Sequence, residues 1–466
     1  MTLKVSSENP RYFEDDGKVV LLVGSHTWYN LQEWSTKPFD IDEYIKILKD
    51  AGHNYTRGWV CKSTYVPWND PVHEVNEIYT RTGTDLAMDG KPKYNLTEFN
   101  QSYFDTMRER IIKLRDAGIY VSVMMMWDSV QFGGVRGYNN GHCYCGENNI
   151  NGVSGTVSNI YNLSRMPENI KTLHSAYVKK VLETVGDLSN VFWEVGNELP
   201  RDSTGFQEFI AAEIRKYEVS PRPIGFTAQN GFAWGTKEGD LAANNILFNS
   251  SADWISPKDT VSGYHTDGYS RNPPINLGDK VIISDTDHLK DINLPRNEKP
   301  RLYQQWAWKS FCRGHNLALM DDMYSPHPDR PATANVLNGR QYIGDVSRYA
   351  SRMVLAACEP SEIMTGYCIF NDEEYLIYQP NKDGNPFTLN IIPGEYDYEW
   401  FNPITSEIHS SGIKEYQGNE KIELPLDHEM VLFLKLHVDE PEPISEDVNI
   451  IVDKTIEPGT YKLIKV

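Results

Sequence analysis

The sequence predicts an α/β protein with a (β/α)₈ barrel followed by a small all-β sandwich domain, and three observations support this prediction. Short apolar runs alternate with amphipathic helical patterns between residues 19 and 325. After about residue 366 the pattern changes to short alternating strands broken by Asn, Gly, Pro and Asp. The chain has 466 residues, which exceeds the ~250–300 residues at which a single core stops growing. One large domain and one smaller domain are therefore expected.

The barrel prediction rests on eight apolar runs, at 19–23, 53–60, 119–127, 191–195, 223–227, 254–256, 281–284 and 317–320. Helical patterns separate them, for example at 40–52, 103–118 and 169–190. Continuous apolar strands separated by helices are typical of a parallel sheet that is buried on both faces. Eight such units favour a closed barrel, and no Gly-rich phosphate loop follows the first run to favour a nucleotide-binding sheet.

The sequence also predicts where the domains divide. The barrel is expected over residues 1–365 and the sandwich over 366–438, where segments such as MVLFLKL alternate with turns. Residues 439–466 begin with an acidic, Pro-containing stretch. We interpret this last segment as a linker with terminal strands that could join the sandwich.

Composition excludes several classes of partner. The formal net charge is −20 and the pI is about 5.1, so no nucleic-acid partner is expected, because phosphate binding requires a basic face. No membrane partner is expected, because the apolar runs are far shorter than the ~20 residues that span a bilayer. The first 13 residues lack an apolar signal core, which predicts a cytosolic, mature or trimmed chain.

Six cysteines are too few for a disulfide scaffold at this length. The cluster His142-Cys143-Tyr144-Cys145 contains residue types that bind zinc. It lacks the second ligand pair of a zinc site, so we interpret these as ordinary loop residues. No metal and no organic cofactor is predicted.

Candidate catalytic residues follow the apolar runs, because catalytic groups of such barrels lie at the C-terminal ends of the strands. The fourth run ends in Asn197-Glu198, and the seventh is followed by Asp285, Asp287 and His288. Two carboxylates across a barrel mouth are what glycoside hydrolysis requires. One donates a proton to the departing oxygen and the other attacks or stabilises the anomeric centre.

At these motifs the chain resembles the retaining (β/α)₈ glycoside hydrolases of clan A. The strand-four ending VFWEVGNE is similar to the acid/base motif of that clan. Further segments resemble a cellulase-like bacterial subgroup: NPRYFEDDGKVVLLVGSHTWYNLQE, GHNYTRGW, ADWISP, KVIISDTDHL and WAWKSFCRGHNLALMDDMY. The segments YLIYQPNKDG and EWFNPITSE resemble the small sandwich of that subgroup, which is sometimes named for collagen binding. An appended fold does not fix a function, so the name carries no weight.

The resemblance implies roles for several residues. Glu198 would be the general acid/base, Asn197 would bind the hydroxyl beside the anomeric carbon, and Arg57 would support the nucleophile. The clan nucleophile is a Glu, whereas this chain offers Asp285, which aligns better by counting from Val281, or Asp287, which lies nearer the mouth. Both remain open, as does retention against inversion, which depends on a carboxyl separation of about 5–5.5 Å.

Other polar and aromatic residues near the strand ends are expected to bind sugar, because aromatic faces stack on sugar rings and carboxylates accept hydroxyl hydrogen bonds. They are His26, Trp28, Trp127, Asp128, Tyr264, His265, His288, Asp321 and Asp322. Tyr264 and His265 rest on the resemblance, which implies a residue there that bonds the nucleophile. Each Trp could equally be a packing residue.

The sequence thus predicts a glycoside hydrolase that cleaves a poly- or oligosaccharide by double displacement, with carbohydrate as its partner. The resemblance implies a secreted or periplasmic bacterial enzyme. Two alternatives remain: a catalytically inactive barrel that binds carbohydrate, and a transglycosylase or lyase that uses the same site.

Overall fold

A computed structural model of the protein describes residues 2–33, 38–60, 76–126, 142–230, 232, 236–258, 268–285, 299–320 and 334–438. Its centre is a parallel sheet of eight strands in the order β4-β13-β12-β11-β10-β9-β8-β5. These strands are β4 (Val23–His26), β5 (Tyr55–Gly58), β8 (Tyr120–Met126), β9 (Val191–Gly196), β10 (Ile224–Thr227), β11 (Trp254–Ser256), β12 (Val281–Asp285) and β13 (Asn316–Met320). The predicted barrel is confirmed.

The first and last strands of this sheet, β4 and β5, meet and nearly close the ring. The backbone N–H of Asn54 donates to the Val23 carbonyl at 2.9 Å, and the Asn54 side chain accepts from the Val23 N–H at 2.9 Å. A Cβ atom on Gly24 would lie 1.6 Å from the carbonyl oxygen of Tyr55. Only glycine therefore permits the close backbone approach at this position.

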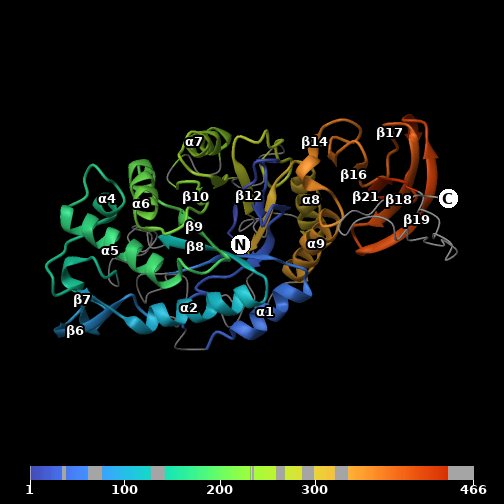
Figure 1. Ribbon diagram of the computed structural model, residues 1–466. Helices are drawn as coiled ribbons and strands as arrows, with labels where there is room; N and C mark the ends of the chain where they lie inside the picture. The colour runs from blue at the N-terminus through green and yellow to red at the C-terminus, as the bar shows by residue number, and fades with distance from the viewer. Residues whose placement is uncertain are drawn as a thin grey trace, which may run out of the picture.

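Helices surround the barrel (Figure 1). They are α1 (Ile41–Asp50), α2 (Gln101–Asp116), α4 (Val157–Ile160), α5 (Glu168–Val185), α6 (Thr204–Tyr217), α7 (Lys237–Phe248), α8 (Lys299–Cys312) and α9 (Ala334–Ala350), with 3₁₀ turns η2 (Gly146–Asn148) and η5 (Leu355–Ala357). The three helices predicted at 40–52, 103–118 and 169–190 are confirmed as α1, α2 and α5. The side chain of Asp40 caps α1 by accepting from two backbone N–H groups. No helix among the described residues is long and apolar enough to cross a bilayer.

The first predicted strand is wrong in its position. Residues Lys18–Val20 form β3, which pairs with β2 (Phe13–Asp15) and not with the barrel, and β2 also pairs with β1 (Lys4–Val5). Asp16 and Gly17, both with positive φ, make the two-residue turn between β2 and β3. The barrel strand begins only at Val23 because this hairpin uses the start of the apolar run.

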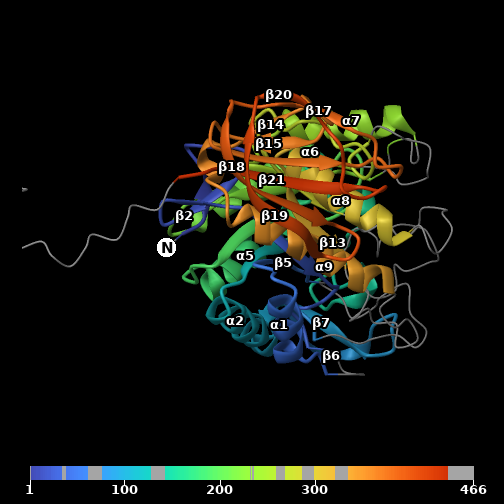
Figure 2. The same cartoon turned by 90° about the vertical axis from the view of Figure 1, so that its right-hand side faces the viewer.

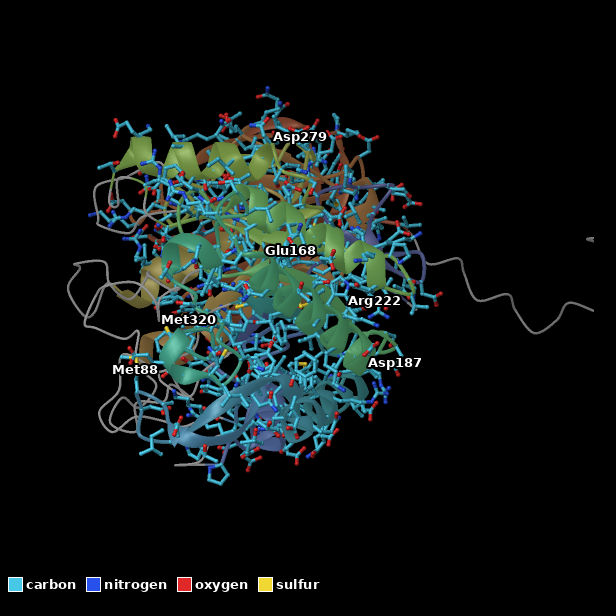
Figure 3. All side chains as sticks on the ribbon, turned by 90° about the vertical axis from the view of Figure 1, so that its left-hand side faces the viewer. Met88, Glu168, Asp187, Arg222, Asp279 and Met320 are labelled. Atoms are coloured by element: carbon cyan, nitrogen blue, oxygen red, sulfur yellow. The ribbon has the colours of Figure 1, made fainter. Side chains whose placement is uncertain are left out.

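Figure 3 distinguishes the two ends of the barrel. Asp187 and Arg222 precede strands β9 and β10 and lie on one side, whereas Met320, the last residue of β13, lies on the other. Met88 lies on the same side as Met320 in this view. It belongs to the turn of a hairpin formed by β6 (Tyr79–Leu86) and β7 (Pro92–Phe99).

The C-terminal strands form the predicted sandwich, which packs against α8 and α9 (Figures 1 and 2). Its larger sheet has the order β14-β15-β16-β21-β18-β19 and its smaller sheet is β17-β20. The bounds are β14 (Glu359–Ser361), β15 (Cys368–Phe370), β16 (Glu374–Gln379), β17 (Phe387–Asn390), β18 (Gly394–Asn402), β19 (Glu407–Tyr416), β20 (Asn419–Ile422) and β21 (Met430–Leu436). Because β14 already pairs in this sheet, we propose that the division between the domains falls near residue 358. Residues 439–466 lie outside the described part.

Aromatic packing joins the two domains. The Trp308 ring on α8 lies 5.7 Å from Tyr349 of α9 and 5.6 Å from Phe401 of β18. Gln304 Nε2 on α8 donates a hydrogen bond to the hydroxyl of Tyr378 on β16 at 3.0 Å. Trp306 and Trp308 are fully buried and are packing residues. Buried aromatic side chains thus attach the sandwich to the barrel, together with polar contacts such as the ion pair of Arg301 with Glu429.

Candidate active site

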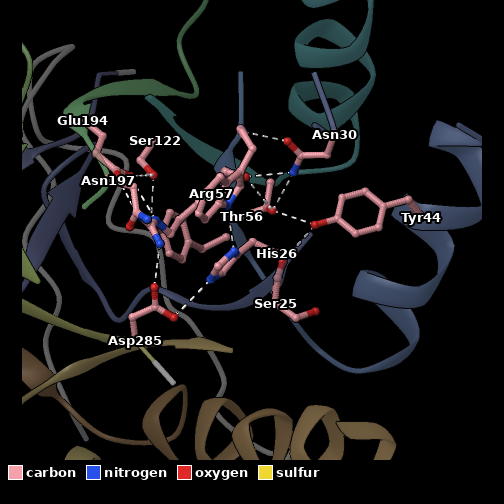
Figure 4. Close-up of polar contacts among 12 residues, drawn as sticks. Ser25, His26, Asn30, Tyr44, Thr56, Arg57, Ser122, Glu194, Asn197 and Asp285 are labelled. Carbon is pink, nitrogen blue, oxygen red and sulfur yellow. Dashed lines mark hydrogen bonds and ion pairs between the residues drawn. The ribbon is translucent and has the colours of Figure 1, made fainter. Parts of the chain in front are cut away.

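Arg57 lies at the centre of the candidate site, at the mouth end of β5 (Figure 4). Its Nε donates to Oε2 of Glu194 at 3.1 Å and its Nη2 donates to Oε1 of the same carboxylate. Nη2 also donates to Oδ1 of Asn197 at 3.0 Å, and Nη1 donates to Oδ2 of Asp285 at 2.5 Å. One planar guanidinium therefore connects residues from β9 and β12.

Glu194 is the buried counter-ion of this guanidinium. Its side chain is 0% exposed, and Ser122 Oγ lies 3.3 Å from Oε2. Tyr55 and Ser122 share a hydrogen bond of 2.9 Å beneath it. Glu194 is therefore a buried carboxylate that pairs with Arg57. Burial would lower the pKa of Arg57, but the charges of Glu194 and Asp285 raise it above the usual value.

His26 holds the second oxygen of Asp285. Its Nε2 lies 3.1 Å from Oδ1 of Asp285, and the Trp59 indole N–H donates to its Nδ1 at 2.8 Å. The His26 and Trp59 rings stack with centroids 5.6 Å apart and planes 16° apart. Both oxygens of Asp285 are therefore held by groups from other strands.

Glu198 follows the end of β9, and neighbouring strands fix its position. The N–H of Asn197 donates to the Met126 carbonyl at 3.0 Å, and Thr227 Oγ1 donates to the Gly196 carbonyl at 2.6 Å. Glu198 itself has φ of +51°, a left-handed conformation that costs a non-glycine residue of order 1 kcal/mol. Such conformations concentrate at functional sites, so this backbone turn is consistent with a catalytic role for the side chain.

Exposure increases from the interior of the barrel toward Asp285. The side chains of His26 and Arg57 are 1% and 3% exposed, whereas Asp285 is 15% exposed. Asn197 and Glu198 are half-buried. Buried donors thus support a carboxylate that substrate can reach. Among the described side chains, Glu194 and Asp285 share the cation of Arg57, so this group retains negative charge when both carboxylates are ionised.

The structure brings together five of the predicted site residues: Arg57, Asn197 and Asp285 in one network, His26 bound to Asp285, and Glu198 next to Asn197 in the chain. Trp28 is half-buried in the turn after β4 and packs against the barrel core. The other predicted site residues lie outside the described part of the chain: Trp127, Asp128, Tyr264, His265, Asp287, His288, Asp321 and Asp322.

Sequence reasoning missed Trp59. It follows Arg57 by two positions, and residues two apart in an extended segment face the same side. This spacing could have predicted that the Trp59 side chain, like that of Arg57, points toward the barrel mouth. The spacing does not predict that Trp59 contacts His26 on β4.

A cavity of about 690 Å³ lies away from this cluster, between α7 and residues 268–274. Lys258 lines it and donates to Oδ1 of Asn230 at 2.8 Å. The chain on either side, at 233–235 and 259–267, is outside the described residues. The candidate site therefore rests on the Arg57 cluster and not on this cavity.

No group of three or more His, Cys, Asp or Glu side chains in the described parts of the chain is arranged to hold a metal ion. His142 Nδ1 accepts from the backbone N–H of Tyr144 at 3.0 Å, and Cys143 is buried, with its carbonyl accepting from Asn149 Nδ2 at 3.1 Å. The His142–Cys145 cluster, which the sequence predicts to be ordinary loop residues, thus makes local contacts within its own loop.

The barrel followed by a sandwich is the fold of glycoside hydrolases of known structure, which confirms the predicted resemblance at the level of the fold. Residues 7–227 match the family model described as "Apiosidase-like, catalytic domain". No curated protein matches the chain.

Solved structures share the whole architecture. A glycoside hydrolase family 5 protein from Bacteroides vulgatus ATCC 8482 is 15% identical, with a TM-score of 0.62 over 93% of this chain and 94% of that chain. A second structure, described as a glycoside hydrolase, is 15% identical, with a TM-score of 0.61 over 93% of this chain and 97% of that chain. At this identity the likeness shows a common fold, barrel and sandwich together.

Proposed function

We propose that this protein is a retaining glycosidase in which Glu198 is the general acid/base and Asp285 is the nucleophile. The observation that carries the proposal is the environment of Asp285. Arg57 and His26 bind its two oxygens from buried positions, while 15% of the side chain remains exposed toward the mouth. A nucleophilic carboxylate needs this combination of fixed orientation and access.

The electrostatics support the same reaction. Glycoside hydrolysis passes through an oxocarbenium-like transition state with positive charge at the anomeric centre. Within the described residues, Glu194 and Asp285 share the charge of Arg57, and their excess negative charge would stabilise the positive charge that develops at the anomeric centre.

Each group has a defined task in two displacements. An oxygen of Asp285 attacks the anomeric carbon while Glu198 gives its proton to the leaving oxygen, and the glycosidic bond breaks. Glu198 then takes a proton from water, which attacks the same carbon and releases Asp285. Oδ1 of Asn197 accepts from Arg57, which leaves the Asn197 amide N–H groups to bind the hydroxyl beside the anomeric carbon.

Asp285 is preferred over Asp287 because its contacts are defined. It is the last residue of β12, where its backbone pairs with Ala318, and it contacts the strand-two arginine. Asp287 lies outside the described residues. The shorter aspartate side chain receives its donors directly from β4 and β5, which face it across the barrel mouth.

The substrate class follows from the family description. Because residues 7–227 match an apiosidase-like catalytic domain, we propose that the enzyme releases a sugar such as apiose from a glycoside and that apiosides should be tested first. A panel of 2,4-dinitrophenyl glycosides, with pentosides and hexosides of both anomers, would compare turnover of the apioside with turnover of other glycosides.

The test combines that panel with three variants. Glu198→Gln and Asp285→Asn should each lower turnover of natural glycans by about 100- to 10,000-fold, the range for a lost acid/base group. Asp202→Asn is the matched control, because this carboxylate is 75% exposed and lies four residues beyond Glu198; its turnover should match the unmodified enzyme.

Other outcomes would favour the alternatives. Glycan binding without hydrolysis across the panel would favour an inactive carbohydrate-binding barrel. Transferred or unsaturated products in mass spectra would favour a transglycosylase or a lyase. Normal turnover in both Glu198→Gln and Asp285→Asn would overturn the proposal.

A further inference from the structure

The two nitrogen atoms of the His26 ring have different, defined partners. The Trp59 Nε1–H can only donate, and it points at Nδ1 of His26 at 2.8 Å. Nδ1 must therefore carry a lone pair. The proton of the neutral ring then lies on Nε2, which is 3.1 Å from Oδ1 of Asp285. The indole thus fixes the tautomer that donates to the carboxylate.

We propose that His26 is a positioning residue for Asp285, held by Trp59 as a neutral imidazole that donates its Nε2–H to Oδ1 and orients the carboxylate for attack. This inference rests on the proposed function, since it gives His26 a task in that reaction. It replaces the sugar-binding role that the sequence indicated for His26, because the ring is buried and both nitrogens are engaged.

Neutrality matters because Asp285 already has one cationic partner. Arg57 donates to Oδ2 from β5, and Glu194 on β9 lies on the far side of that guanidinium. A second cation on Oδ1 would stabilise the ionised carboxylate further and weaken it as a nucleophile. A neutral N–H orients the group with a weaker hydrogen bond.

In the part of the chain that the structure describes, Trp59 is the partner of Nδ1 of His26. On β13, the residue paired with His26 is Met320. From α1, Tyr44 directs its hydroxyl to the Ser25 carbonyl and to Thr56. Among the described residues, the charged groups of this network are Asp285, Arg57 and Glu194. Protonation would place a second N–H on Nδ1, opposite the Trp59 N–H.

Trp59 is itself well fixed. It is 2% exposed, its backbone N–H donates to Oδ1 of Asn30 at 2.8 Å, and the Arg57 guanidinium lies 4.9 Å from its ring centroid. The indole is thus held between the arginine and the histidine that bind Asp285. Its N–H direction follows from this packing.

The first test compares His26→Phe with His26→Gln on the dinitrophenyl glycoside that the enzyme turns over fastest. His26→Phe removes the donor, and kcat should fall about 100-fold, the loss that misplacing a reacting group by about 1 Å produces. KM should change less than kcat. His26→Gln keeps an N–H near the Nε2 position, and it should recover most of the loss. Equal kcat for His26→Phe and the unmodified enzyme would overturn the proposal.

The second test examines the Trp59 hydrogen bond through the pH dependence of kcat. Trp59→Phe removes the N–H that opposes protonation of Nδ1, so kcat should show an additional loss on the acidic side. The double variant Trp59→Phe/His26→Gln has no imidazole, and the additional loss should disappear. If Trp59→Phe shows the same pH dependence of kcat on the acidic side as the unmodified enzyme, the role of Trp59 is wrong. This measurement also tests the proposal if His26→Phe does not fold.

Asp285→Asn separates this proposal from the proposed function. If Asp285→Asn is inactive while His26→Phe and Trp59→Phe behave as the unmodified enzyme, the positioning role is wrong and the glycosidase mechanism stands. If Asp285→Asn retains turnover, the mechanism itself is wrong.

Discussion

Nη1 of Arg57 lies 2.5 Å from Oδ2 of Asp285, although 228 positions separate the two residues in the chain. The same guanidinium binds Glu194 and Asn197 on β9. Arg57 therefore relates the proposed nucleophile on β12 to the segment that carries the proposed acid. Loss of this one side chain should disturb both halves of the site.

Arg57→Ala should abolish turnover and destabilise the fold by about 3–5 kcal/mol, because it leaves Glu194 buried without a counter-ion. The double variant Arg57→Met/Glu194→Leu removes both buried charges and should recover most of the stability without the activity. Urea unfolding measures the first effect and glycoside turnover the second. A double variant as unstable as Arg57→Ala would show that the pair is not the source of the loss.

Glu198→Gly should raise the free energy of unfolding by about 1 kcal/mol while it abolishes turnover, because glycine adopts the positive φ of this position without strain. Asp202→Gly is the matched control, since Asp202 has φ of +73° and an exposed side chain. It should stabilise the protein similarly and leave turnover unchanged. Urea unfolding that shows Glu198→Gly to be less stable than the unmodified protein would contradict strain at this residue.

Stability should fall as pH is lowered from about 6.5 toward 4, because two buried histidines remain neutral in the fold. Burial lowers the pKa of His53 to about 4 and that of His315 to about 3. The unfolded chain, with histidine pKa values near 6.5, binds protons first, so each histidine costs about 1.4 kcal/mol per pH unit within this window. Above pH 6.5 both histidines are neutral in the folded and the unfolded chain, so this loss of stability is absent.

Variants of the two histidines separate their effect from that of the carboxylates that titrate in the same pH range, when the slopes of unfolding free energy against pH are compared. His53 Nε2 donates to the Arg340 carbonyl, and His315 accepts from Ser284 and donates to the Pro274 carbonyl. The variants His53→Gln and His315→Gln should each show a shallower loss of unfolding free energy between pH 6.5 and 4. Slopes equal to that of the unmodified protein would contradict the assignment.

Much of the fold could be predicted from the sequence because parallel barrel strands are buried on both faces and appear as continuous apolar runs. The first strand was misplaced for a physical reason. VVLLV is apolar throughout, and hydrophobicity does not mark where β3 ends and β4 begins. The Asp16-Gly17 turn, a strong hairpin signal, assigns Lys18–Val20 to a different sheet.

Part of the candidate site could be predicted because its residues follow apolar runs that the sequence marks as barrel strands. Asn197, Glu198 and Asp285 end barrel strands, so their positions follow from the order of the strands. The tautomer of His26 depends on Trp59, and that contact joins β4 to the residue after β5 through side-chain orientation. Periodicity gives the face on which a side chain lies but not the atom that it meets.

Trp308→Ala should uncouple the sandwich from the barrel, because this ring contacts Tyr349 on α9 and Phe401 on β18. The cost of removing such a buried aromatic is about 3–5 kcal/mol. Calorimetry should resolve two transitions in place of one. Trp193→Ala, in the barrel core, should lower stability without separating the transitions; two transitions in that control as well would show that the interface is not specific to Trp308.

The glycosyl-enzyme itself gives the most direct test of the account. In Glu198→Ala, a dinitrophenyl glycoside still reacts at the first step, since its leaving group needs no acid, but water is no longer activated for the second. Mass spectrometry of the intact protein should show one added glycosyl group, and peptide mapping should place it on Asp285. Azide should release it as a glycosyl azide. An adduct on Asp287, or turnover without any adduct or azide product, would contradict Asp285 as the nucleophile.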